Sequence, residues 1–178
     1  MLSKTILSAA FILFVPFTYA ATIAQVAAAN SALTNSAVSL DSSVVAINAQ
    51  TPTATKQQVP FNLQTLNLAI VRNQSALTPT TATSDPPSEN QVTRSFGLFA
   101  NTIQELADDY KGALKYLKPI PNLERDTYNQ LNYLNTNFGN YANFMVGIVN
   151  DSASKTYIRN NLKYTMQDIQ SAITAYTT

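Results

Sequence analysis

The sequence has 178 residues, of which 46% are apolar and 12% charged, and it contains no Cys and no His. Thiol nucleophiles, imidazole bases, Ser-His-Asp relays, zinc fingers and His-ligated metal sites all need one of these residues, so most enzyme mechanisms are excluded. Eleven basic and ten acidic residues give a formal charge of +1, which argues against a nucleic acid as partner. We therefore expect no catalytic residue, no metal site and no cofactor.

Residues 1–20 have the features of a secretory signal peptide. Lys4 supplies a positive start, 6–17 is a mostly apolar run, and the Thr-Tyr-Ala sequence ending at Ala20 places small residues at the cleavage site. A membrane anchor is the alternative, but the run is shorter than the roughly 20 apolar residues that a span needs. We expect secretion, to the medium or the cell wall, of one helical domain over 21–178 with no stable transmembrane segment.

The first predicted helix lies between residues 21 and 48. Apolar or small residues recur there at alternating steps of three and four, which is typical of a helix packed in a bundle. Asn30 occupies one of these positions, where an unpaired amide would cost roughly 1–3 kcal/mol. It is expected either to hydrogen bond to another helix and fix the register, or to face a ligand cavity. The repeating positions are Ile23, Val26, Asn30, Leu33, Ala37, Leu40, Val44 and Ile47.

Two segments rich in Thr and Pro flank the second predicted helix. Residues 51–58 read as a linker, after which Pro60 suits the first turn of a helix whose apolar positions run over 59–77. Residues 80–87 mix Thr, Ser, Ala and Pro, a composition that predicts a mobile surface loop.

The third predicted helix begins at Ser88-Glu89-Asn90-Gln91, which has the form of a capping box, and ends at Lys118. Asn122 is expected to cap a fourth helix, and a turn at 150–152 begins a fifth. No segment alternates as a strand does. The predicted fold class is therefore all-α, an up-and-down bundle of four or five long amphipathic helices.

The charged residues of the third predicted helix allow a functional and a structural interpretation. Asp108-Asp109 with Glu105 is a tight acidic cluster, and we expect Asp108 to pair with Lys111 on a solvated face rather than to perform acid–base chemistry. The three lysines Lys111, Lys115 and Lys118 suit the end of a helix dipole. They would also suit an acidic ligand head group or an anionic wall polymer.

Aromatic residues and methionines share the later predicted helices, whereas the first two carry small or polar residues at their apolar positions. Core packing is the default for such stripes, but small residues opposite large rings leave open a bundle whose middle is not filled, as in bundles that bind ligands. The candidate ligand-binding residues are Asn30, Phe96, Phe99, Ile103, Leu106, Leu134, Phe138, Met145, Leu162, Met166 and Ile169.

Two sequons for N-glycosylation occur, at Asn73 and Asn150. Asn150 lies at a predicted turn and is the better candidate. Asn73 is expected to be modified only if it points outward, because the acceptor must be accessible.

The opening helix of alternating aliphatic steps and the closing segment 169–176, of the type Ile-x-x-Ala-Ile-x-Ala-Tyr, resemble the fungal hydrophobic surface-binding protein A and cell-wall galactomannoprotein family. The resemblance implies a secreted, non-enzymatic helical bundle. Its implied partner is a hydrophobic surface or a lipid such as a fatty acid, and cell-wall polysaccharide is a further candidate.

The main alternative is a glycosylated cell-wall structural protein, or a secreted effector that acts by protein–protein contact. The two functions predict different interiors. A continuous apolar tunnel of several hundred Å3 would favour lipid binding, whereas a filled core would favour the interaction role.

Overall fold

The structure is a computed structural model and describes residues 20–177. Residues 1–19, which hold nearly all of the predicted signal peptide, lie outside this range. The described residues form five long helices and a short one. They are α1 (Ile23–Val45), α2 (Thr53–Lys56), α3 (Gln58–Leu77), α4 (Pro86–Leu117), α5 (Leu123–Ile148) and α6 (Ser152–Ala175). Isolated bridges are the sole β-structure within this range, so the all-α prediction is confirmed.

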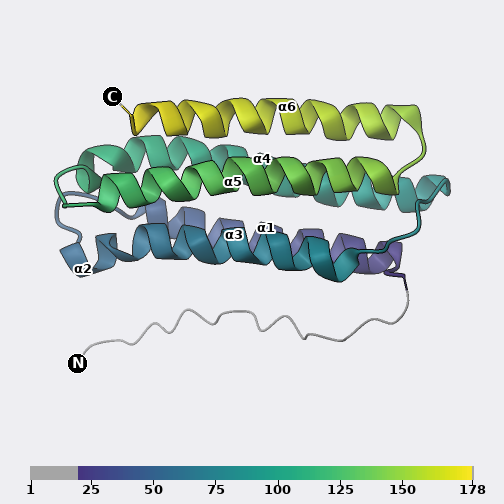
Figure 1. The fold of residues 1–178 in the computed structure, drawn as a ribbon, viewed down its shortest axis with the longest axis horizontal. Helices are drawn as coiled ribbons and strands as arrows, with labels where there is room; N and C mark the ends of the chain where they lie inside the picture. Colours follow the sequence, from purple (N-terminus) through teal and green to yellow (C-terminus); the bar gives the residue numbers. More distant parts are fainter. Residues whose placement is uncertain (1–19, 178) are drawn as a thin grey trace.

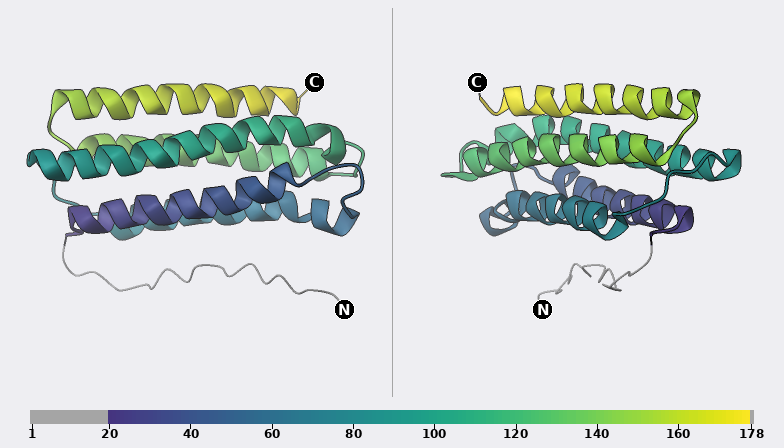
Figure 2. Two further views of the ribbon diagram at one scale, coloured as in Figure 1. Left: turned by 180° about the vertical axis from the view of Figure 1, so that it is seen from behind. Right: turned by 45° about the vertical axis from the view of Figure 1, so that its right-hand side comes forward.

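The long helices form an up-and-down bundle in three layers (Figure 1). α1 and α3 lie side by side in one outer layer, α4 and α5 form the middle layer, and α6 lies alone on the far side (Figure 2). α1 packs on α4, α3 packs on α5, and α6 covers both α4 and α5. The backbones of α4 and α5 come close at few positions, although a short turn joins them. Side chains and α6 therefore bridge the space between these two helices.

The start of α4 differs from the predicted capping box at Ser88. The helix begins at Pro86, and the Asp85 carboxylate is the N-cap, accepting a hydrogen bond of 3.1 Å from the Ser88 backbone N–H. Pro86 and Pro87 occupy the first turn, where a missing N–H leaves no bond unmade. The prediction was wrong because Asp85 and the two prolines already form a complete helix start.

The predicted joints are more ordered than their composition indicates. The linker 51–58 contains the helix α2, which the sequence did not predict. The predicted loop 80–87 is fixed to the turn between α5 and α6, because the Thr83 backbone N–H donates to the Ile148 carbonyl at 2.8 Å. At the start of α5, Asn122 adopts a left-handed conformation, with φ of 66°, and makes no side-chain capping bond. The position of this cap was predicted correctly, but its hydrogen bond was not.

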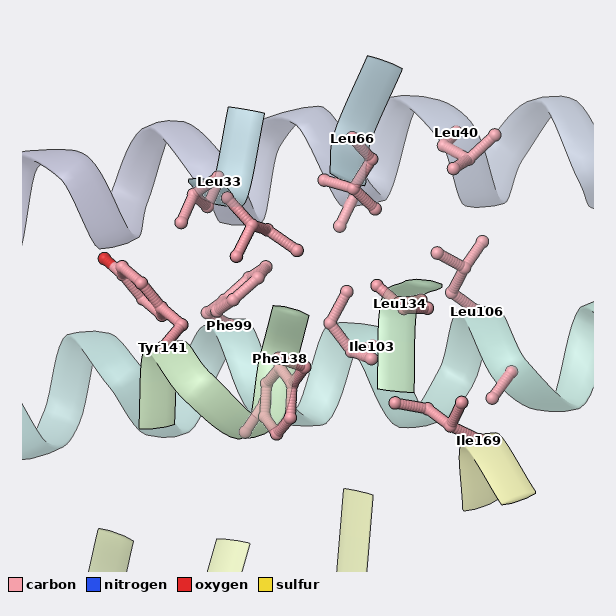
Figure 3. Packing of buried hydrophobic residues seen from close by; sticks show 14 of the residues in the cluster. Leu33, Leu40, Leu66, Phe99, Ile103, Leu106, Leu134, Phe138, Tyr141 and Ile169 are labelled. Carbon is pink, nitrogen blue, oxygen red and sulfur yellow. The ribbon is translucent and has the colours of Figure 1, made fainter. Parts of the chain in front are cut away.

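A cluster of aromatic rings fills the middle layer. The centroid of Phe138 lies 5.8 Å from that of Phe96 and 5.8 Å from that of Phe99, and Phe99 meets Tyr141 edge-on at 6.0 Å. All four side chains are completely buried. Figure 3 shows Phe99 and Tyr141 on the side facing Leu33, and Phe138 reaching toward α6. These rings keep α4 and α5 apart and join the layers on either side into one core.

Candidate ligand-binding site

The structure brings the candidate ligand-binding residues into one cluster. Most have no exposed surface, and two of the three on α6, Leu162 and Met166, are partly buried against the same core. Many of them lie between the outer layer of α1 and α3 and the middle layer of α4 and α5 (Figure 3). The fully buried members are Asn30, Phe96, Phe99, Ile103, Leu106, Leu134, Phe138, Met145 and Ile169.

Asn30 makes the interhelical hydrogen bonds that its position demands. Its Nδ2 donates to Ser95 Oγ at 2.9 Å, and its Oδ1 accepts from the Tyr141 hydroxyl at 2.7 Å. Burial raises the pKa of Tyr141 above its ordinary range, so the phenol stays protonated and donates. This polar trio joins α1, α4 and α5, as expected from the first of the two interpretations of Asn30. A role of Asn30 in ligand binding stays a prediction.

The candidate residues fill the interior of the bundle rather than line a tunnel. Two hollows among the described residues lie at the surface, and no candidate residue lines either one. The first, of about 250 Å3, lies between the start of α3 and the start of α5. The second, of about 530 Å3, lies at the end of the bundle where α4 turns into α5. An acyl chain therefore enters the core only if the side chains or helices move apart.

The acidic residues pair partly as predicted. Lys111 forms an ion pair with Asp108, which confirms the expected solvated pair on α4. The sequence did not reveal that Asp109 meets Asp41 of α1. Burial, then a hydrogen bond with Asp109, and then the charges of Asp109 and Glu105 raise the pKa of Asp41 to about 7. Within residues 20–177 no cluster of acidic side chains is arranged to hold a metal ion.

The Asp41–Asp109 contact predicts that folding stability falls as pH rises through 7. The pKa of Asp41 is about 7 when folded, against an ordinary value of 3.8, so the native state binds a proton that the unfolded chain has released. The stabilisation is complete below pH 3.8 and lost above pH 7. Between pH 5 and 8 we expect the wild type to lose about 1 kcal/mol relative to Asp41→Asn, after allowing for solvent screening of this partly exposed pair.

Urea denaturation at several pH values tests this expectation. In Asp41→Asn the side-chain amide donates to Asp109 and carries no titrating proton. The variant should therefore lack the extra loss of folding stability that the wild type shows as the pH rises. Asp168→Asn, on α6 in the opposite outer layer, is the control and should follow the wild type. Parallel pH profiles for the wild type and Asp41→Asn would show that the two carboxyl groups do not share a proton.

The fold separates the two glycosylation candidates. Asn73 is 5% exposed, and its amide nitrogen is buried. The side chain does not point outward, so the condition for a glycan at Asn73 is not met in this fold. Its place in the apolar repeat of α3 explains the burial. Asn150 is exposed at the turn before α6 and stays a predicted site.

Glu89 is a structural residue that the sequence analysis missed. It is 4% exposed, and its Oε1 accepts hydrogen bonds from the backbone N–H groups of Asn150 at 2.7 Å and Asp151 at 2.9 Å. The carboxylate thus fixes the turn between α5 and α6 to the start of α4. Its place inside the supposed capping box gave no sign of this distant contact.

Comparison with known proteins identifies the fold. No protein-family model matches the sequence, and no curated protein matches it significantly. The crystal structure of AfMP4p in complex with palmitic acid aligns with a TM-score of 0.79 and 14% identity, over 87% of this chain and 99% of that one. Ligand binding domain 1 of the Penicillium marneffei MP1 protein, complexed with arachidonic acids, aligns with a TM-score of 0.74 and 10% identity, over 87% and 96%. At such identities the likeness establishes the shared fold.

No helix among residues 20–177 combines the length and the hydropathy that crossing a membrane requires.

Proposed function

We propose that this protein is a secreted, non-enzymatic bundle that binds a fatty acid with the acyl chain in its apolar interior. The observation that carries the proposal is its fold, which it shares over most of its length with two proteins solved in complex with palmitic and arachidonic acid. The buried side chains supply a suitable lining, because they form one cluster across all five long helices. No catalytic group is needed for this function.

The energy of acyl burial is the gain that offsets the cost of opening a filled core. Each buried CH2 gains about 0.8 kcal/mol, so a long chain supplies roughly 10 kcal/mol before ordering costs. If only open molecules bind the ligand, the apparent affinity equals the affinity of the open state multiplied by the fraction of molecules that are open. Two features of the middle layer would help it to adapt: the backbones of α4 and α5 come close at few positions, and the flexible Met145 and Met166 lie in or against the core.

Native mass spectrometry of delipidated protein incubated with palmitate tests the proposal. We expect one added palmitate per chain and, at a hundred times the dissociation constant, a stabilisation of about 2.7 kcal/mol. Hexanoate is the matched control and should not bind measurably, because it lacks most of the methylene groups. Equal masses with and without palmitate would contradict the proposal. A filled core also suits the alternative function, a wall structural protein or an effector. Fatty-acid uptake that depends on chain length would favour lipid binding over that alternative.

Adsorption to hydrophobic surfaces is a second candidate function, favoured by the outer layer of α1 and α3. Residues 21–84 carry three charged side chains, those of Asp41, Lys56 and Arg72. On α3, Phe61 is 60% exposed and Leu68 is 48% exposed. If this face adsorbs, Phe61→Ser with Leu68→Ser should weaken retention on polystyrene beads while leaving palmitate binding unchanged. Equal retention of the variant and the wild type would exclude this face.

A further inference from the structure

The end of the bundle offers a site for the carboxylate of the fatty acid. We infer that Lys118 and Arg125 bind this carboxylate in the hollow of about 530 Å3, and that Tyr176 is the gate between the hollow and the core. The inference rests on the proposed function and extends it by naming the head-group site and the path of the chain. The lining residues are Lys118, Glu124, Arg125, Tyr128, Tyr176 and Thr177.

The chemistry of a fatty acid requires its two ends to lie in different surroundings. Its carboxylate is ionised at neutral pH, and an unpaired buried charge costs several kcal/mol, whereas the chain gains by leaving water. The polar trio of Asn30, Ser95 and Tyr141 offers neutral groups inside the core. The hollow instead offers two cations at the solvent edge. With Glu124 as the one carboxylate of the lining, the rim keeps a net positive charge next to an apolar core, which matches both ends of the ligand.

Both cations are available to a new partner. The Lys118 Nζ lies 3.5 Å from Glu124 Oε1, and its side chain is 51% exposed. The Arg125 Nε lies 3.7 Å from Asp126 Oδ1, and its side chain is 70% exposed. Exposed pairs of this kind are worth about 0–1 kcal/mol, so exchanging one for a ligand carboxylate costs little.

Tyr176 is where the hollow meets the core. It lines the hollow, yet it is 4% exposed and belongs to the buried cluster. Its hydroxyl donates to the Tyr110 carbonyl at 2.9 Å, and the Tyr110 hydroxyl donates to the Val59 carbonyl at 3.4 Å. Tyr110 lies on α4 in the same cluster as Leu106 and Ile103. Moving the Tyr176 ring aside therefore opens a way from the hollow toward the candidate ligand-binding residues.

The two ends of α6 are held by different kinds of contact. The first end follows the turn that the Glu89 carboxylate fixes through two backbone hydrogen bonds. The last turn ends at Ala175, and Tyr176 directly after it donates its hydroxyl proton to the Tyr110 carbonyl. In this last turn Ala172 and Ile173 are buried against the core. Opening at Tyr176 therefore has to break the hydrogen bond to Tyr110 and expose part of this turn.

Competition between palmitate and hexadecan-1-ol tests the head-group site in the full bundle. The two ligands share a chain length and differ in charge, so the wild type should bind palmitate about tenfold more tightly. Lys118→Gln with Arg125→Gln should abolish this difference by weakening palmitate binding about tenfold and leaving the alcohol unchanged. Lys155→Gln with Arg159→Gln removes the same charge at the other end of the bundle and should behave as the wild type.

Labelling and kinetics locate the gate. Because the sequence contains no Cys, a single introduced Cys can be labelled with one environment-sensitive fluorophore. The two labelled variants are Thr177→Cys, just after the end of α6, and Ala153→Cys, near its start. Palmitate should change the signal at position 177 and not at 153. Tyr176→Phe keeps the ring but loses the hydrogen bond to Tyr110, and should speed uptake about fivefold.

The possible outcomes separate the two proposals. If neither ligand binds, the proposed function fails and the head-group site fails with it. If both ligands bind equally, or if the double variant at Lys118 and Arg125 leaves the preference for palmitate intact, the head-group site is wrong while fatty-acid binding stands. A signal change at 153 rather than 177, or uptake by Tyr176→Phe at the wild-type rate, overturns the assigned path.

Discussion

Replacing Phe138 with Ala is expected to lower the free energy of unfolding by about 3–5 kcal/mol. Phe138 is completely buried, and its ring contacts those of Phe96 and Phe99 at centroid distances of 5.8 Å. The loss combines the lost burial of the ring with a cavity between α4 and α5, whose backbones come close at few positions. Urea denaturation followed by circular dichroism measures it.

Phe61→Ala is the matched control, because the Phe61 side chain is 60% exposed. The control should change the free energy of unfolding by no more than about 0.5 kcal/mol. Equal losses for Phe138→Ala and Phe61→Ala would show that the aromatic cluster does not hold the middle layer together.

Glu89→Ala is expected to cost about 2–4 kcal/mol and to loosen one particular turn. The variant removes the buried acceptor of the Asn150 and Asp151 backbone N–H groups. Asn150 keeps a second acceptor, the Thr83 carbonyl at 3.1 Å, so the Asp151 amide should be affected more. Hydrogen exchange at these two amides, together with urea denaturation, measures the effect.

Glu89→Gln separates the hydrogen bonds from the volume of the side chain. It keeps a carbonyl acceptor of the same size without the charge, and should lose about half as much stability as Glu89→Ala. Unchanged exchange at Asp151 in Glu89→Ala would mean that the carboxylate does not hold the turn.

Local periodicity explains why the helices were predictable. The apolar steps of α1, from Val26 to Val44, place every repeating residue on one face of a helix, and the fold buries them all. The buried Asn73 fills a step in the repeat of α3 in the same way. A residue's own neighbours determine these features, so the sequence contains the information.

Contacts between distant residues were not predictable from the same patterns. The expected partners of Asn30 proved to be Ser95 and Tyr141, and Asp41 meets Asp109, because the order of helices around the bundle decides which faces meet. A short turn joins α4 and α5, yet their backbones come close at few positions, since large rings lie between them. Whether the interior is filled depends on side-chain volumes in three dimensions, which spacing along the chain does not specify.

Intermolecular nuclear Overhauser effects from 13C-labelled palmitate test the central claim most directly, because they report which side chains the acyl chain contacts. If the bundle opens to hold the ligand, cross-peaks from the palmitate methylene protons should reach the buried side chains of Ile103, Leu106 and Leu134. Cross-peaks confined to the exposed Phe61, Leu68 and Val71 would contradict interior binding and place the lipid on the outer face of α3.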